Sequence, residues 1–300
     1  MISIVTPTYN RAKFLNRLFR SLKSQLCTDF EWIIIDDGST DETRATVNRF
    51  IFENAVDITY IAQENRGKHV AINSAVKHCR GEWTFIVDSD DMLTPDAIST
   101  LSNHLSLIQC DRRFCGISAV KTTLDRQIIG RQPESDITDV AFFDFYHKLG
   151  YNGDRALVFR TDLLRENPFP IFDNEKFLPE GILWETISRN KLVRFITTPV
   201  YICEYQTDGL SARYHDLMIS NPVGNALYYK ILSEHPDATF LTRVRCSFMH
   251  RHLLNIAIKN GCDISAIKTS GTLRFYHLIA PVFSPFYKLK SLFKQFKASK

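Results

Sequence analysis

The first 100 residues alternate between short apolar runs and stretches with helical periodicity, and a polar cluster ends nearly every apolar run. This alternation is typical of βαβ units around a mostly parallel central sheet flanked by helices, which is an α/β fold. Strands are predicted over residues 2–5, 32–35, 58–62 and 83–87, and helices over residues 11–26 and 68–79. Two more helices are predicted to begin at Ser39, through a capping box with Glu42, and at Thr94, which Pro95 follows.

The polar clusters that end these strands carry most of the functional information. They occupy residues 6–10, 36–39, 65–68 and 88–91. In an open parallel sheet, the carboxyl ends of the strands line the ligand crevice. We therefore expect the four clusters to converge on one site at one edge of the sheet.

The cluster Asp88-Ser89-Asp90-Asp91 places three carboxylates within four residues at a strand end. Such carboxylates repel one another unless a cation or hydrogen-bond donors lie close by. Oxygen ligands suit Mg²⁺ or Mn²⁺, which bind through one or two carboxylates together with substrate phosphates. The alternative is a solvated acidic turn that caps the next helix. The position after a buried strand favours a metal site.

Two neighbouring clusters offer groups that suit a nucleotide. The carboxylates of Asp36 and Asp37 can accept hydrogen bonds from a base or a ribose, and Gly38 allows a ligand to approach the backbone. Lys68 can neutralise phosphate charge. The simpler interpretations are a strand-to-helix turn for the first cluster and a solvated helix N-terminus for the second, although the helix dipole disfavours a lysine there.

Four motifs together resemble the family 2 glycosyltransferases with the GT-A fold, of the type that builds bacterial surface polysaccharides such as O-antigen or capsule. They are Thr6-Pro7-Thr8-Tyr9-Asn10, residues 35–41 around Asp37-Gly38-Ser39, Asn65-Arg66-Gly67-Lys68 and Val87-Asp88-Ser89-Asp90-Asp91. The resemblance implies a nucleotide-diphospho-sugar transferase in which residues 1–104 bind the nucleotide sugar. It also implies that Thr8 and Asp37 contact the base, that Asp88 contacts the ribose region, and that Asp90 binds the metal, with Asp91 as an additional candidate.

The second half, residues 105–214, resembles the acceptor half of this family. Residues 153–160 and 177–184 look like acceptor-side segments, with Glu180 matching the family and Gly181 standing where many members carry Asp. Glu180 is the expected catalytic base, with Glu185 and Asp154 as alternatives. The simpler interpretation of Glu180 is a glutamate that stabilises the N-terminus of a helix through the helix dipole.

Residues 207–213 resemble a flexible segment that closes over the donor diphosphate in many relatives. Ser211 and Arg213 could hold phosphate oxygens there, since an arginine fits phosphate well; a plain surface loop is the alternative. The full set expected to contact the donor is Thr6, Pro7, Thr8, Tyr9, Arg11, Asp37, Lys68, Asn73, Asp88, Ser89, Ser211 and Arg213.

The function that the resemblance implies is inverting transfer of a hexose or N-acetylhexosamine from a UDP-sugar to a hydroxyl of a lipid-linked saccharide, with Mn²⁺ or Mg²⁺ as cofactor. Transfer directly to a polyprenyl phosphate would leave the same motifs. A non-catalytic nucleotide-sugar-binding protein is a further alternative. A phosphatase with an aspartate nucleophile fits less well, because Met92 follows Asp91 where a threonine or valine is expected.

Residues 215–300 are predicted to form a helical C-terminal region with a basic amphipathic tail. Residues 286–300 place aromatic and leucine side chains at helical spacing among five lysines, which suits the surface of an anionic membrane. A terminal helix packed on the core is the alternative.

The chain shows neither a signal peptide nor an apolar run of bilayer length, and its seven cysteines are scattered. We expect a cytoplasmic protein, peripheral on the inner face of the cell membrane. The net charge of +4 is too small to indicate a nucleic-acid partner, and none is expected.

Overall fold

The computed structural model describes residues 1–204, 206, 209 and 212–283. Two of the sequence-based predictions concern residues outside these ranges, namely Ser211 and the basic tail over residues 286–300.

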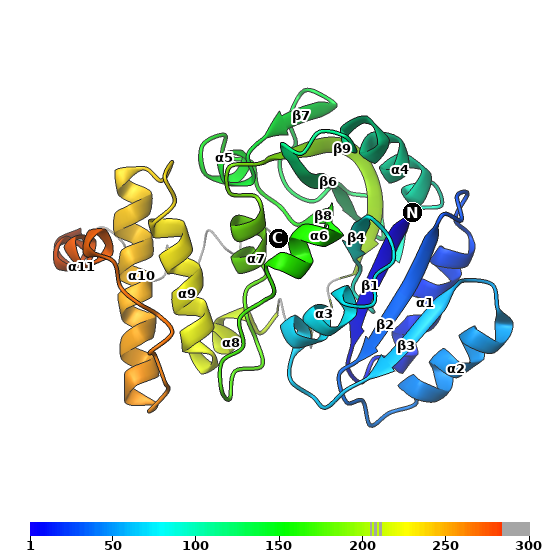
Figure 1. Ribbon diagram of the computed structural model, residues 1–300, viewed down its shortest axis with the longest axis horizontal. Helices are drawn as coiled ribbons and strands as arrows, with labels where there is room; N and C mark the ends of the chain where they lie inside the picture. Colours follow the sequence, from blue (N-terminus) through cyan, green and yellow to red (C-terminus); the bar gives the residue numbers. More distant parts are fainter. Residues whose placement is uncertain (205, 207–208, 210–211, 284–300) are drawn as a thin grey trace.

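A nine-stranded sheet forms the centre of the molecule, in the order β3-β2-β1-β4-β8-β6-β9-β5, with β7 paired to β9 (Figure 1). The strands are β1 (Ile2–Thr8), β2 (Phe30–Asp36), β3 (Ile58–Ala62), β4 (Trp83–Ile86), β5 (Met92–Leu93), β6 (Phe114–Thr123), β7 (Ile137–Val140), β8 (Arg155–Arg160) and β9 (Leu192–Cys203). Strands β3, β2, β1 and β4 are parallel, which confirms the pattern predicted for the first 100 residues.

The second half of the sheet is mixed. β8 runs antiparallel to both β4 and β6, and β9 is parallel to β6 but antiparallel to β5 and β7. The sheet as a whole is therefore less parallel than the first 100 residues indicate. Two of these strands, β6 and β7, lie between residues 105 and 150, where the sequence has no clear period.

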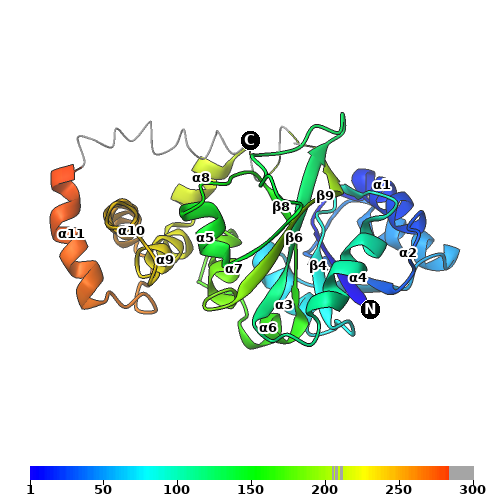
Figure 2. The same cartoon turned by 90° about the horizontal axis from the view of Figure 1, so that it is seen from above.

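Helices cover both faces of the sheet (Figure 2). The helices up to β9 are α1 (Ala12–Lys23), α2 (Thr43–Glu53), α3 (Lys68–Val76), α4 (Ala97–Ile108), α5 (Phe142–His147), α6 (Thr161–Glu166) and α7 (Gly181–Ile187). Helices α1, α2 and α4 pack their apolar stripes on one face, where Leu15, Leu18 and Leu22 are buried. On the other face, α3 packs on β1 and β2, and α6 and α7 pack further along.

Two predicted helix starts are wrong in detail. The second helix begins at Thr43, because the Asp41 carboxylate accepts hydrogen bonds from the backbone and hydroxyl of Thr43. Ser39 instead accepts a hydrogen bond from the backbone of Asn10, so no capping box forms. The fourth helix begins at Ala97, and Thr94 lies in the turn before it.

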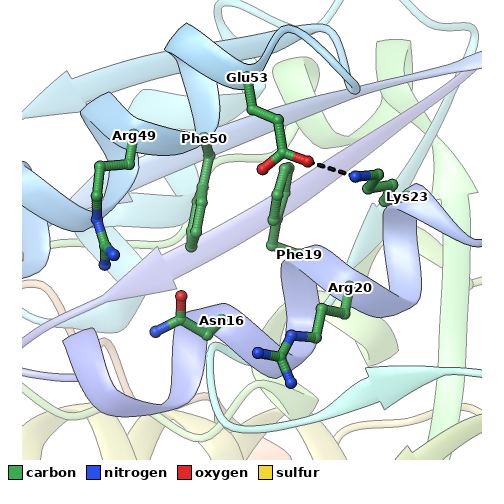
Figure 3. A pocket seen from close by; sticks show the side chains of 7 residues that line it. All are labelled: Asn16, Phe19, Arg20, Lys23, Arg49, Phe50 and Glu53. Atoms are coloured by element: carbon green, nitrogen blue, oxygen red, sulfur yellow. Dashed lines mark hydrogen bonds and ion pairs between the residues drawn. The ribbon is translucent and has the colours of Figure 1, made fainter.

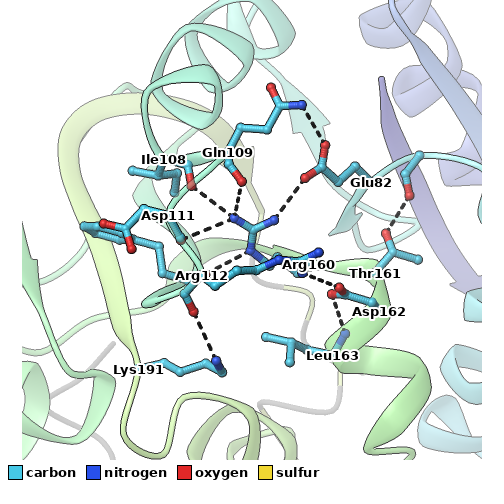
Figure 4. Close-up of polar contacts among 12 residues, drawn as sticks. Glu82, Ile108, Gln109, Asp111, Arg112, Arg160, Thr161, Asp162, Leu163 and Lys191 are labelled. Carbon is cyan, nitrogen blue, oxygen red and sulfur yellow. Dashed lines mark hydrogen bonds and ion pairs between the residues drawn. The ribbon is translucent and has the colours of Figure 1, made fainter.

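Arg160, at the end of β8, ties three elements together (Figure 4). Its guanidinium donates to the carbonyl groups of Phe114, Ile108 and Gln109 and pairs with Glu82 at 2.9 Å. Two of these carbonyls lie at the end of α4, where a helix leaves carbonyl groups without intrahelical partners. The buried arginine therefore replaces the missing donors and fastens α4 to the middle of the sheet.

The C-terminal part of the described chain is helical, as predicted. It contains α8 (Tyr214–Ser220), α9 (Pro222–Ser233), α10 (Phe240–Lys259) and α11 (Gly271–Phe283). Helix α9 packs against α7, and α10 and α11 follow as outer layers (Figures 1 and 2). Within the described ranges, no helix has both the length and the apolar character needed to cross a bilayer. All seven cysteines lie among the residues that the structure describes, and all are free thiols.

Candidate functional site

A pocket of about 200 Å³ lies where the strand ends of the first half meet the second half of the sheet. Lys68 and Asp88, which follow β3 and β4, enter it from one side, and Glu180, directly before α7, enters from the other. The remaining lining residues are Ile86, Lys121, Phe142, Tyr146, Asp154, Arg155, Leu157 and Trp184. The pocket thus combines charged groups from both halves with aromatic and aliphatic walls.

Lys68 connects the two halves electrostatically. Its ammonium group contacts the Asp88 carboxylate and lies 2.7 Å from the Glu180 carboxylate. Burial alone would lower the pKa of Lys68, but the two carboxylates outweigh it and hold that pKa well above its usual value. Asp88 responds in the opposite direction: burial acts to raise its pKa, while Lys68 and Lys121 lower it overall. Three residues from separate segments therefore form one charged group.

The three aspartates of the acidic loop have different surroundings. Asp91 is buried, and its carboxylate accepts hydrogen bonds from the Tyr201 hydroxyl at 2.7 Å and the backbone N–H of Glu204 at 3.2 Å. The same tyrosine hydroxyl accepts a hydrogen bond from the backbone N–H of Asp88. Asp91 therefore fastens the loop to the end of β9 and is not directed at a ligand.

Asp90 has no ion-pair partner among the described residues. Burial and then the neighbouring Asp88 carboxylate raise its pKa, against the opposing charges of Arg11 and Lys68. A divalent cation would relieve this repulsion, so the residues present fit Mg²⁺ or Mn²⁺. No group of three His, Cys, Asp or Glu side chains forms a complete metal cage in the described part of the chain. The arrangement suits a cation whose remaining ligands are water and substrate phosphates.

Asp37 shapes the loop that carries Lys68. Its carboxylate accepts hydrogen bonds from the side chain of Gln63 and from the backbone N–H groups of Arg66 and Gly67, at 2.7–3.0 Å. Gly67 has a φ of +99°, and an added Cβ would lie 2.1 Å from the carbonyl oxygen of Lys176. Asp37 thus determines where α3 begins and where Lys68 points.

The two threonines of the first cluster have different surroundings. The Thr6 hydroxyl accepts a hydrogen bond from the Trp32 indole N–H at 2.9 Å, inside the core. The Thr8 hydroxyl is buried and has no hydrogen-bond partner among the described residues, and the Thr8 carbonyl accepts a hydrogen bond from the backbone of Asp37. Pro7 is buried and Tyr9 is exposed. An unpaired buried hydroxyl costs stability, so Thr8 is the member of this cluster best suited to meet a ligand.

The remaining predicted residues are spread around the site. Arg11 lies at the start of α1, and its guanidinium stacks on Phe14. Asn73 exchanges two hydrogen bonds with the backbone of Phe169, at 2.8 and 2.9 Å, so its side chain holds the segment before α7. Ser89 is buried within the acidic loop. Arg213 is exposed directly before α8.

The two alternative bases occupy different places. Asp154 lines the pocket but is paired with Lys121, whose ammonium lies 2.9 Å away. Glu185 is buried on the far side of α7 at 3.8 Å from His147, and burial raises its pKa to about 8. Glu180 is the carboxylate that lies beside both Lys68 and Asp88. The geometry therefore favours Glu180 over both alternatives.

Some residues of the pocket carried no recognisable signal in the sequence. Lys121 is buried on β6, with its ammonium 4.4 Å from the centre of the Tyr201 ring. Tyr146 and Trp184 supply aromatic walls. Tyr146 and Lys121 come from the region between residues 105 and 150, and no motif marks either of them.

A second pocket, of about 360 Å³, lies away from the strand ends, between α1 and α2 (Figure 3). Its floor is the stacked pair Phe19 and Phe50, whose ring centres are 4.2 Å apart. Arg20, Lys23 and Arg49 form a basic rim, with Lys23 paired to Glu53. None of the predicted site residues lines this groove.

The chain is similar in sequence to enzymes that handle sugars. Chondroitin synthase of Escherichia coli is 41% identical over 130 residues, which are 42% of this chain and 18% of that protein. The GalNAc(5)-diNAcBac-PP-undecaprenol β-1,3-glucosyltransferase of Campylobacter jejuni is 26% identical over 193 residues, 63% of this chain and 60% of that protein. The chain therefore spans less than two thirds of the length of either relative.

The fold is also shared with a solved structure. Residues 1–349 of Staphylococcus aureus TarS in complex with UDP superpose with a TM-score of 0.58 at 18% identity, covering 94% of this chain and 87% of that one. The sequence model for glycosyl transferase family 2 matches residues 3–165, more than half of the chain. The chain therefore belongs to glycosyl transferase family 2 and has the GT-A fold.

Proposed function

We propose that the protein transfers a hexose or N-acetylhexosamine from a UDP-sugar to a hydroxyl of a lipid-linked saccharide during bacterial surface-polysaccharide synthesis. In this proposal residues 1–104 bind the nucleotide sugar, residues 105–214 bind the acceptor, and residues 215–300 form a helical C-terminal region. The observation that carries it is the contact of Lys68 with both Asp88 and Glu180, because it joins a phosphate-neutralising cation to a carboxylate on the acceptor side.

Glu180 acts as the general base. Its carboxylate takes the proton of the acceptor hydroxyl, and that oxygen forms a bond to the anomeric carbon as the bond from this carbon to the phosphate oxygen breaks. The nucleoside diphosphate leaves with the electron pair, and the configuration at the anomeric carbon inverts. Aromatic walls such as Trp184 and Tyr146 suit the apolar faces of a sugar ring.

The donor side stabilises the charge of the leaving diphosphate. Lys68 lies at the start of α3 beside Asp88, and Arg213 lies at the start of α8, so both can meet phosphate oxygens. Thr8, whose buried hydroxyl has no partner within the described part of the chain, and Asp37 lie on the side expected for the base. Asp90 is the residue that would hold Mn²⁺ or Mg²⁺, and the ion would supply Lewis-acid stabilisation of the diphosphate when bound.

The relatives support the choice of substrates. The Campylobacter enzyme acts, by its name, on a polyprenyl-diphosphate saccharide, and the TarS structure holds UDP. The basic amphipathic sequence over residues 286–300 suits an anionic membrane surface, where a lipid-linked acceptor would be found. We therefore place the enzyme at the inner face of the cell membrane.

A donor screen tests the proposal. The full chain is incubated with Mn²⁺ or Mg²⁺, a panel of UDP-, GDP- and dTDP-sugars and a synthetic lipid-diphosphate saccharide, and released nucleotide and product mass are measured. Acceptor-dependent release of UDP from one UDP-sugar, lost with a chelator and absent in Glu180→Gln, is expected. Nucleotide-sugar binding without release, for every donor and acceptor, would overturn the transferase assignment in favour of a binding protein.

A further inference from the structure

Gly181, which follows Glu180 and opens α7, lies against a side chain from the C-terminal helical region. A Cβ added at Gly181 would lie 2.6 Å from Cε2 of Tyr228 and 3.2 Å from its hydroxyl oxygen. Real Cβ atoms do not approach other atoms as closely as the first of these distances. The ring of Tyr228, on α9, therefore occupies the space that any larger residue at position 181 would need.

The backbone at position 181 does not itself require glycine. The backbone of Gly181 is helical and lies outside the left-handed region that favours glycine. A glycine in a helix is less favourable than alanine when no contact requires it. The contact with Tyr228 is therefore the physical reason for the glycine.

Helix α9 is rigidly attached on the same side. The buried carboxylate of Glu175 accepts hydrogen bonds from the backbone N–H groups of Val223 and Gly224, at 2.6 and 2.7 Å. The Asn221 side chain accepts from the backbone of Lys176, whose ammonium in turn donates to Asn65 beside the Lys68 loop. The first turn of α9 is thus connected both to the segment before α7 and to the donor-side loop.

Tyr228 lies against Gly181, the residue that directly follows Glu180 in the chain. The carbonyl of Glu180 accepts the first hydrogen bonds of α7, from the backbone of Leu183 and Trp184, so Glu180 moves with this helix. The Tyr228 ring packs with the buried cluster that includes Trp184 and Leu183. A shift of the ring would move the start of α7 and the Glu180 carboxylate together.

We propose that Tyr228 is a positioning residue of the active site, holding the start of α7 so that Glu180 faces Lys68 and the acceptor. The inference rests on the proposed role of Glu180 as base. In this proposal the C-terminal helical region helps to position the acceptor side of the site, through the contact between Gly181 and Tyr228.

The first test compares Tyr228→Ala with Tyr228→Phe and Tyr229→Ala. Tyr229 is the neighbouring residue of α9, but it is buried with Met218 and Leu253 and away from α7, so its loss controls for general destabilisation. For Tyr228→Ala we expect kcat of sugar transfer to fall about 10- to 100-fold, the size typical of a displaced reacting group. UDP affinity should stay within about 2-fold, because Tyr228 packs against Gly181 and the cluster around α7 and does not line the pocket that Lys68 and Asp88 enter, as far as the structure describes the chain. Tyr228→Phe should retain wild-type kcat, since the ring and not the hydroxyl makes the closest contact.

The second test uses Gly181→Ala, which disturbs the same contact from the other side and keeps Tyr228. We expect Gly181→Ala to lower kcat in the wild-type protein. In the Tyr228→Ala background the same substitution should lower kcat by less, because both variants disturb one shared contact. Equal losses of kcat in Tyr228→Ala and Tyr229→Ala, or a wild-type kcat in Gly181→Ala, would overturn the proposal. Sugar transfer by the wild-type protein in the same assay tests the proposed function by itself. A failure of the proposed function is therefore distinguishable from a failure of the positioning role of Tyr228. If Tyr228→Ala does not fold, Gly181→Ala alone decides.

Discussion

The Lys68 ammonium lies 2.7 Å from the Glu180 carboxylate, although the two residues are 112 positions apart in the chain. Lys68 also contacts Asp88, so in the proposed function it is shared between a donor-side and an acceptor-side carboxylate. A donor diphosphate entering this site competes with both carboxylates for the same ammonium. Binding of the donor would then release Glu180 to accept a proton from the acceptor, and proton transfer would follow donor binding.

Replacing Lys68 should therefore affect chemistry more than folding. In Lys68→Met we expect kcat/KM for sugar transfer to fall by about 100-fold or more, because a charge that stabilises the leaving group is lost. The expectation is checked by steady-state kinetics with the donor that the screen identifies. Lys68→Arg retains the charge and is the matched control, expected to keep much of the activity. Equal kcat/KM in Lys68→Met and the wild type would remove Lys68 from the mechanism.

Asp90 and Asp154 allow the metal site to be tested without turnover. Asp90→Asn should weaken Mn²⁺ binding in the presence of UDP by about 10-fold or more, because a cation of this kind depends on its few carboxylate ligands. Asp154→Asn, in the same pocket but paired with Lys121, should leave the Mn²⁺ affinity within about 2-fold. Electron paramagnetic resonance of free Mn²⁺ measures both. If both variants bind Mn²⁺ like the wild type, the metal lies elsewhere.

The sequence predicted the meeting of the four polar clusters well because one physical rule governs it. Parallel strands end at one edge, so the clusters after β1, β2, β3 and β4 had to meet. The resemblance to family 2 glycosyltransferases, drawn from those clusters, is confirmed by the family match over residues 3–165. The details inside the clusters depend on competing side-chain partners. Asp41, for example, determines the start of α2 in place of Ser39.

The second half of the pocket was less predictable because its residues arrive on antiparallel strands and irregular segments. Lys121 and Tyr146 reach the pocket from a region without a clear period, and no motif marks them. The contact of Gly181 with Tyr228 joins residues 47 positions apart, on helices whose packing the sequence does not reveal. Close approach between helices is a property of packing, and local sequence patterns carry little information about it.

Glu185 predicts a specific dependence of stability on pH. Burial raises the pKa of Glu185 to about 8, above the ordinary value for a glutamate. The folded protein therefore holds this proton more tightly than the unfolded chain does. The contribution of Glu185 to stability is fully present below about pH 4.3 and is lost as the pH rises towards 8. Between these limits the free energy of unfolding should decline with pH.

Glu185→Gln removes this titration, so its unfolding free energy should fall less between pH 5 and pH 8 than that of the wild type. Urea denaturation at several pH values measures the difference. Glu134→Gln changes a glutamate that the structure leaves exposed, and its pH dependence should match the wild type. Parallel curves for Glu185→Gln and the wild type would show that Glu185 titrates normally.

Arg160 and Arg112 give a matched pair for testing the junction at the end of α4 (Figure 4). Both arginines pair with a carboxylate, but Arg160 is 2% exposed and also donates to backbone carbonyls, whereas Arg112 is largely exposed. Arg160→Met should lower the free energy of unfolding by about 3 kcal/mol, because it leaves buried carbonyl groups without donors. Arg112→Met should lower it by less than about 0.5 kcal/mol, as is usual for a surface ion pair. Urea denaturation of the two variants measures both values, and equal losses would show that the Arg160 hydrogen bonds do not hold α4 to the sheet.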